Sequence, residues 1–254
     1  MTMIQYNNLY NNKNMKVINE LGCVKVFEHQ KDLSVYSPVE AINAYYAAKM
    51  NVRKRQVLIE LNGNAFTISA GSMQWMSGDV DMVADVKGIG DLFGKALSSK
   101  VTKESAIKPK YKGNGLLMLE PTYKHILLEE VSQWKGLVLD DGLFLACDSN
   151  ITQKVVARTN LSSAALGNEG LFNLCLMGQG IAVLESPVPR EELIEFNLQD
   201  DVLKIDGNMA IAWSNSLEFK VEKSGKSLLG SAVSGEGFVN VYRGTGKVLV
   251  APSL

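Results

Sequence analysis

Short runs of alternating hydrophobic and polar residues make up most of the chain, and glycines separate many of these runs. The run at residues 56–61, QVLIEL, is followed by Asn62-Gly63, a pair that favours a hairpin turn because both residues tolerate positive φ. From Phe66 to Ala70, apolar and polar residues alternate one by one, which turns one apolar side of a strand toward a core. The pattern predicts a strand, a tight turn and a second strand.

The chain keeps this character after Lys112, where six further segments contain apolar runs and turn residues. They are GNGLLMLEP, HILLEEV, LVLDDGLFLAC, GLFNLCLMGQGIAVLES, VLKIDGNMAIAW and GFVNVYRGTGKVLVAPS. Such a series of short strands is typical of all-β proteins. A short strand is also predicted where Val24 and Val26 alternate with Lys25. Residues 1–15, rich in Asn and Tyr, predict a poorly ordered start or a strand added at a sheet edge.

Two segments break the β pattern and predict helices. Ser37, Pro38 and Glu40 stand where a helix start has its capping hydroxyl, first-turn proline and reciprocal carboxylate. We expect this helix to continue to about Met50. One face of it carries Ala41, Tyr45 and Ala48. A short helical excursion is predicted at residues 91–97, where apolar residues recur at helical spacing.

A phrase that begins at Gly71, GSMQWMSGDV, returns in looser form at Gly142 (GLFLACDSNI) and at Gly207 (GNMAIAWSNS). A second phrase, a glycine doublet before an apolar strand, alternates with it. The opening glycines lie 71 and 65 residues apart, which predicts a supersecondary unit repeated three times. The predicted organisation is an N-terminal extension at 1–55 and a β domain at 56–254, with repeats at about 56–112, 113–164 and 165–254.

Repeated β units leave strand edges whose unpaired backbone groups invite aggregation. Repeats that close on themselves, or that pair with a neighbouring subunit, hide these groups. The sequence therefore predicts a closed homo-oligomer, with a trimer as the favoured state.

The composition is that of a folded globular protein, with 46% hydrophobic and 21% charged residues. The formal net charge of -1 gives no global attraction to nucleic acid or to an anionic membrane. The N-terminus lacks the pattern of a signal peptide, and no apolar run approaches the length of a membrane span. The cysteines Cys23, Cys147 and Cys175 have no metal or redox spacing, and the latter two are predicted to be buried. We expect a cytoplasmic protein.

Residues with the potential for catalysis are scattered. His29 and His125 lie 96 residues apart without a local ligand partner, whereas a cupin-type metal site needs clustered ligands. There is no Gly-x-Ser-x-Gly elbow, and the glycines at residues 88–94 follow no βαβ strand, so they are weak indicators of phosphate binding. The residues predict no catalytic site, no cofactor site and no metal site.

The acidic pairs Glu129-Glu130, Asp140-Asp141 and Asp200-Asp201 suit calcium or general-acid roles, but neighbouring strand residues point to opposite faces. Asp141-Gly142 and Asp206-Gly207 are interpreted as turns. Trp75, Trp134 and Trp213 fall once in each repeat; they mark either equivalent ligand pockets or, as we expect, core or interface anchors.

A basic stretch between Lys95 and Lys112 offers either a phosphate-binding patch or a solvated connection. Its lysines are Lys95, Lys100, Lys103, Lys108, Lys110 and Lys112. The solvated connection is favoured, because the stretch has no arginine cluster and only Tyr111 as a platform for base stacking. Nucleic acid is therefore not the expected partner.

The order and spacing of several segments resemble a family of bacterial proteins related to a mitochondrial protein named for altered inheritance of mitochondria. The resemblance runs from about Gln56 to the end. It rests on VLIELNGNAFTISAGSMQWMSGDVDM, GIGDLFGKAL, GNGLLMLEP, LDDGLFLACDSNI, GLFNLCLMGQGIAVLES and GTGKVLVAPS. Residues 1–55 lie outside it, and Lys103-Glu104-Ser105 departs from the Gly-Glu-Ser expected there. The family resembles the tryptophan RNA-binding attenuation protein in fold, which implies antiparallel β-sandwich units similar to a shortened double-stranded β-helix.

The sequence thus predicts a mainly β, three-repeat protein with one N-terminal helix and a short helical excursion. The first functional hypothesis is a non-enzymatic oligomeric scaffold or protein-interaction module. The alternative is a small-molecule or nucleic-acid binding module, and a cupin-like metalloenzyme comes last.

Overall fold

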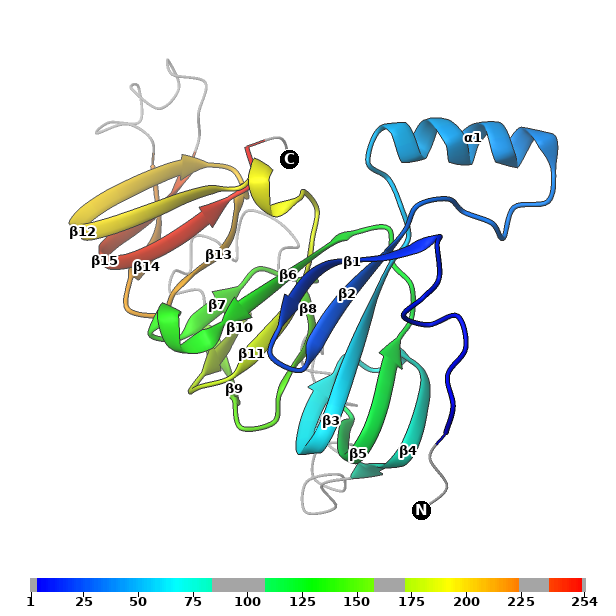
Figure 1. Ribbon diagram of the computed structural model, residues 1–254. Helices are drawn as coiled ribbons and strands as arrows, with labels where there is room; N and C mark the ends of the chain where they lie inside the picture. Colours follow the sequence, from blue (N-terminus) through cyan, green and yellow to red (C-terminus); the bar gives the residue numbers. More distant parts are fainter. Residues whose placement is uncertain (1–3, 84–107, 158–171, 224–237, 253–254) are drawn as a thin grey trace, which may run out of the picture.

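In the part of the chain that the structure describes, two curled antiparallel sheets form the body, and one α-helix stands apart from them (Figure 1). The computed structural model describes residues 4–83, 108–157, 172–223 and 238–252. Within these ranges the chain is mainly β with one α-helix, as predicted. The predicted helical excursion at 91–97 and the lysines Lys95, Lys100 and Lys103 lie outside the described residues.

Sheet A has eight strands. They are β1 (Met15–Leu21), β2 (Val24–His29), β3 (Arg55–Ile68), β4 (Met73–Val83), β5 (Lys110–Leu119), β6 (His125–Glu130), β8 (Phe144–Asp148) and β11 (Ile181–Ser186). The order is β1-β2-β3-β8-β11-β6, and β5 joins β3 to β4. The long strand β3 pairs with β2 and then β8 on one side and with β5 on the other.

Sheet B has seven strands. They are β7 (Leu137–Leu139), β9 (Thr152–Ala157), β10 (Phe172–Met177), β12 (Ile194–Asp206), β13 (Ala210–Ser214), β14 (Glu218–Lys223) and β15 (Phe238–Val250). The order is β12-β15-β13-β7-β10-β9, with β14 against β15. Two short 3-10 helices, η2 (Val131–Trp134) and η3 (Arg190–Glu192), follow β6 and precede β12.

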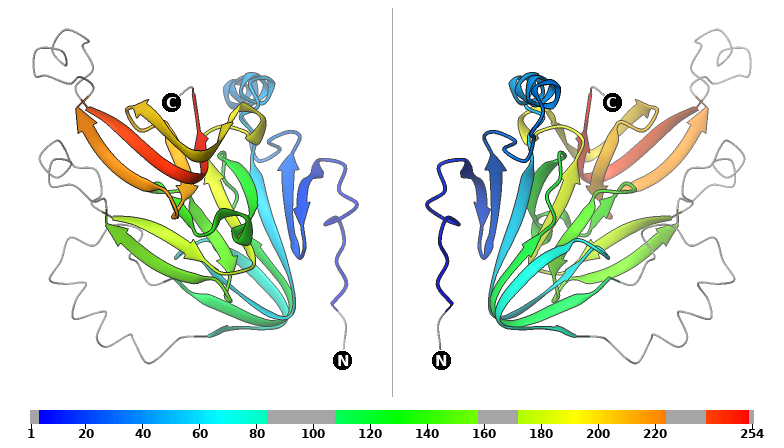
Figure 2. Two further views of the ribbon diagram at one scale, coloured as in Figure 1. Left: turned by 90° about the vertical axis from the view of Figure 1, so that its left-hand side faces the viewer. Right: turned by 90° about the vertical axis from the view of Figure 1, so that its right-hand side faces the viewer.

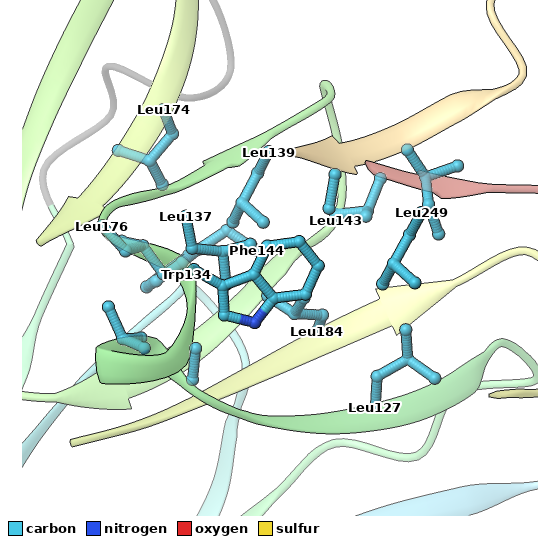
Figure 3. Close-up of a cluster of buried hydrophobic side chains, with 14 of the residues drawn as sticks. Leu127, Trp134, Leu137, Leu139, Leu143, Phe144, Leu174, Leu176, Leu184 and Leu249 are labelled. Carbon is cyan, nitrogen blue, oxygen red and sulfur yellow. The ribbon is translucent and has the colours of Figure 1, made fainter. Parts of the chain in front are cut away.

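The middle of the chain crosses repeatedly between the sheets, because β6, β8 and β11 belong to sheet A while β7, β9 and β10 belong to sheet B. A shared core results, in which Trp134 packs among leucines from both sheets (Figure 3). Each sheet also encloses a core of its own. Trp134 and Trp213 are buried and Trp75 is partly buried against sheet A, so their interpretation as core anchors is confirmed for the first two.

The predicted hairpin at Asn62-Gly63 is wrong, because β3 runs through both residues. Gly63 does have positive φ, 81°, but it uses it in a β-bulge, where the register against β5 shifts between Asn62 and Ala65. The side chain of Asn64 accepts a hydrogen bond of 2.9 Å from the backbone N–H of Asn62 and holds the bulge. The sequence correctly indicated that Gly63 tolerates positive φ, but turns and bulges both use this conformation.

The three glycines that open the repeated phrase do occupy turns. Gly71, Gly142 and Gly207 have φ values of 78°, 79° and 65°, and a strand begins within three residues of each. These strands differ in their surroundings: β4 pairs only with β5 among the described strands, while β8 and β13 each lie between two neighbours. The turn interpretation is therefore confirmed, and the threefold repeat remains a prediction.

The N-terminal segment lies across the outer face of sheet A. Leu9 and Met15 pack against a cluster formed by Phe27, Leu58, Leu116 and Met118. Tyr10 donates a hydrogen bond of 2.8 Å to Glu60. Met15 begins β1, which pairs with β2. The start of the chain thus covers a sheet face before it adds an edge strand.

Candidate functional site

The most distinctive surface is carried by residues 30–54, which we call the arm. It leaves the body after β2, forms helix α1 (Pro38–Lys49) and returns at β3. Figures 1 and 2 show α1 beyond the ends of the sheet A strands, joined to the body by the two connecting segments. The arm is therefore a projection rather than a layer of the fold.

Local interactions define where α1 begins and ends. The hydroxyl of Ser37 accepts a hydrogen bond of 3.2 Å from the N–H of Glu40 and donates one of 3.0 Å to its carboxylate. Pro38 occupies the first turn, where its missing N–H costs nothing. At the other end, the N–H of Met50 donates to the carbonyl of Tyr46, and Asn51 takes a positive φ of 61°. The predicted cap and helix are confirmed.

What is unusual is that none of the twelve residues of α1 is buried by the described part of the chain. Only Glu40, Asn43 and Lys49 bear charged or amide side chains. A helix that is apolar around its whole circumference is normally enclosed by protein. An isolated helix of this length is also marginal in water. Both arguments indicate that α1 needs a surface that the described body does not provide.

The helix has two distinct faces. Residues Val39, Ile42, Tyr46 and Met50 recur at helical spacing and form what we call the ridge, with exposed fractions of 68, 57, 65 and 78%. The other face is built from small residues. They are Ala41, Ala44, Ala47 and Ala48. The alanine face lines two hollows, and the ridge lies on the opposite side of the helix.

The first hollow has a volume of about 370 Å³ and lies between α1 and the body. Ala44, Ala47 and Ala48 form its helix side, and His29, Lys54 and Tyr123 are among the residues on its body side. The second, of about 480 Å³, lies between α1 and the preceding loop and includes Leu33, Val35 and Tyr45. Both volumes fall in the range of small-molecule sites.

The charged groups beneath the helix are paired with one another. Arg55, only 1% exposed, donates to Glu28 at 2.8 Å, and Arg53 donates to the other oxygen of the same carboxylate at 3.1 Å. Arg55 also donates to the carbonyl and the side chain of Asn51, directly after α1. This buried network anchors the base of the arm to strands β2 and β3.

A second hydrogen-bond network, also beside the first hollow, is centred on Asp32. It accepts hydrogen bonds from Ser34, from Lys54 at 3.0 Å and from the Tyr123 hydroxyl at 2.9 Å. Burial alone would raise the pKa of Asp32, but these donors together hold it well below its usual value. Burial and the nearby carboxylate raise the pKa of Tyr123 in turn. These hydrogen bonds hold the loop before α1 to Lys54 and Tyr123, and we call this charged loop the strap.

The histidines do not meet. His29 shares a hydrogen bond of 2.8 Å with Gln56, whose amide donates to Gln74. Burial, reinforced by the charge of Arg55, lowers the pKa of His125. Among the described residues, no three His, Cys, Asp or Glu side chains gather in the way a metal ion requires.

The cysteines and the acidic pairs occupy structural positions. Cys147 and Cys175 are buried as predicted, and burial raises the pKa of the Cys147 thiol to about 12. Glu129 accepts a hydrogen bond of 3.1 Å from the Trp134 indole, and Glu130 is its neighbour on β6. Asp200 and Asp201 lie at an irregularity in the pairing of β12 with β15.

The described end of the basic stretch is likewise structural. Lys110 and Lys112 belong to β5, and the ammonium of Lys108 lies 5.1 Å from the centre of the Phe144 ring. Sequence reasoning predicted the helix of the arm but not its exposure. The sequence did contain a sign of this exposure, because three polar residues in twelve are too few for a helix with one face in water.

Within the described ranges, no helix has the length and apolar character that crossing a membrane requires.

Comparisons with known proteins cover most of the body and only the end of the arm. A family model described as mitochondrial biogenesis AIM24 matches residues 48–253, so the match begins at the end of α1. Seven chains of solved structure match. One is the crystal structure of protein SPYM3_0169 from Streptococcus pyogenes, with 28% identity and a TM-score of 0.57, covering 81% of this chain and 90% of that chain. No curated protein matches significantly. Because the family model spans most of the chain, the protein belongs to the mitochondrial biogenesis AIM24 family.

Proposed function

We propose that the protein is a non-enzymatic interaction module, an oligomeric β scaffold of the cytoplasm whose docking element is the arm. The observation that carries this proposal is α1, a capped helix with an apolar ridge and no residue buried by the described chain. Folding such a helix into open water gains little, whereas docking it would bury the ridge. Function would then lie in what the arm binds, not in a reaction.

The two hollows support a second candidate, a small-molecule site beside the alanine face of the helix. Their volumes, about 370 and 480 Å³, suit a ligand of modest size. The charged side chains beneath α1 already form ion pairs with one another, as in Arg53–Glu28 and Lys54–Asp32. An apolar ligand therefore fits this candidate better than a charged one.

The finer architecture belongs to the same proposal. We take the body to contain three related units, with the turn glycines Gly71, Gly142 and Gly207 as their shared mark, and to be akin to the tryptophan RNA-binding attenuation protein in fold. Their similar positive φ values support this relation. The two-sheet arrangement would then derive from the three units by strand exchange.

Site-specific photo-cross-linking tests the docking role. A photoreactive phenylalanine analogue replaces Ile42 on the ridge in the cells from which the protein comes, and the same analogue replaces Val155 as the control. Val155 is 58% exposed, close to the 57% of Ile42, but lies on β9. We expect a discrete cross-linked product from position 42 and none from position 155. Absence of any product from the ridge would refute the docking proposal.

A further inference from the structure

We propose, resting on the docking role of the arm, that its occupant is a second copy of this chain, bound ridge to ridge. The ridge is symmetric along the helix: Val39 and Met50 lie at its ends, with Ile42 and Tyr46 between them. Two antiparallel copies related by a twofold axis therefore place Val39 of one against Met50 of the other. Ile42 then meets Tyr46 of the second copy. Such self-complementarity is what an isologous dimer requires.

The ridge offers enough apolar area for a specific contact between two copies. Its four side chains, Val39, Ile42, Tyr46 and Met50, are 57–78% exposed. With on the order of 150–250 Å² for an aromatic side chain and less for an aliphatic one, the ridge presents on the order of 500 Å². Two ridges together bury about 1,000 Å², the area that a biological interface should reach.

The charges of the helix are compatible with pairing of two copies. The helix carries one charge of each sign, Glu40 and Lys49. The cations at the base, Arg53 and Lys54, are paired with Glu28 and Asp32. A patch of one sign would repel its copy, but a balanced and mainly apolar patch meets no such penalty.

A membrane surface is a less suitable occupant. Helices that lie in a bilayer interface combine an apolar face with a strongly charged one, usually rich in lysine and arginine. Here the face opposite the ridge consists of alanines, and Lys49 is the only basic residue of the helix. The helix instead has the composition of one that is enclosed by protein on all sides.

Sedimentation of the purified full chain gives the main test. We expect a dimer across the micromolar range, with twice the 27.8 kDa mass of the chain. Tyr46→Asp should raise the dissociation constant by about 30-fold or more, as loss of a central contact does. The control Val155→Asp should leave it unchanged. Circular dichroism checks that both variants keep the strands, which we expect because Tyr46 is 65% exposed in the described structure.

Disulfide trapping tests the antiparallel register. On a Cys23→Ser background, a mixture of Val39→Cys and Met50→Cys copies should cross-link readily, whereas neither variant should cross-link with itself. In an antiparallel pair, two cysteines at position 39 lie about 16 Å apart along the axis, far beyond disulfide reach. Efficient cross-linking of each variant with itself would mean a parallel pair and would overturn the proposed register.

The outcomes separate this inference from the docking role. A ridge cross-link in cells at a mass other than twice that of the chain would overturn the second copy and leave docking intact. An oligomer that Tyr46→Asp does not weaken would assign self-association to another surface and overturn the ridge pairing. Co-sedimentation with phosphatidylcholine vesicles that Tyr46→Asp abolishes would assign the ridge to a membrane. Absence of any ridge product would overturn both proposals.

Discussion

The body and the arm treat their apolar residues in opposite ways. In the body, Trp134 of η2 packs among leucines from both sheets, and these side chains are almost wholly enclosed (Figure 3). In the arm, Tyr46 and its neighbours on the ridge face outward. In both regions the secondary-structure elements follow ordinary local rules: α1 is capped, and turns precede several of the strands. The difference teaches that the described body encloses most of its large apolar residues within itself, while the arm leaves those of the ridge exposed.

The family match adds to this comparison. It covers residues 48–253, so it takes in nearly all of the two-sheet body apart from β1 and β2. The ridge, except for Met50, precedes the matched region. The matched part of the molecule therefore contains most of the enclosed apolar residues, although not those of β2, and most of the exposed helix lies outside it.

The largest expected effect comes from removing a core aromatic, with an arm aromatic as the matched control. Trp134→Ala should lower the free energy of unfolding by about 3–5 kcal/mol, because it opens a cavity between the sheets and leaves Glu129 without its indole donor. Tyr46→Ala should change it by less than about 0.5 kcal/mol in dilute protein. Urea denaturation followed by circular dichroism measures both. Equal losses would mean that the arm is part of the folded core after all.

The β character and the helix of the arm could be read from the sequence because both depend on local rules. Ser37, Pro38 and Glu40 sit within a few residues of each other and specify a helix start without help from the rest of the fold. The turn glycines Gly71 and Gly142 are equally local, since positive φ is a property of one residue.

Sheet membership could not be read in this way. The strands β6, β7 and β8 follow one another in sequence, yet they alternate between sheets A and B, and long-range pairing decides this. The hairpin predicted at Asn62-Gly63 was wrong for a related reason. Strand β5 pairs with β3 on both sides of these two residues, so the positive φ of Gly63 forms a bulge and not a turn. The exposure of α1 depends on what does not cover it, and the only local sign of anything unusual is that three polar residues in twelve are few for a helix with one face in water.

An intermediate effect is expected at the strap that joins the two regions. Asp32→Asn should destabilise the protein by on the order of 1 kcal/mol at neutral pH, because donors from Ser34, Lys54 and Tyr123 favour the carboxylate. The pKa of Asp32 is lower in the folded chain, so its stabilisation is full above the unfolded pKa of about 4 and is lost as pH falls through the folded value.

Unfolding curves of the wild type and Asp32→Asn at a series of pH values test this strap. The gap between them should shrink progressively below about pH 4. Asp79→Asn, at an exposed position of β4, is the control for loss of a surface carboxylate and should leave the free energy of unfolding at neutral pH unchanged. A gap that stayed constant down to strongly acidic pH would mean that the Asp32 charge does not hold the loop.

The smallest effect on global stability, and the most specific to the arm, is expected from Ser37→Ala. Loss of the cap should destabilise α1 by about 1 kcal/mol, yet leave the urea midpoint of the body unchanged, because no residue of the helix is buried against the described sheets. Hydrogen exchange of the α1 amides should accelerate about fivefold, whereas Ser132→Ala on the body should not alter it. If two ridges pair, helix formation and dimerisation are linked, so the dissociation constant should rise by about the same factor. A change in exchange without a change in association would separate the folding of the helix from its docking.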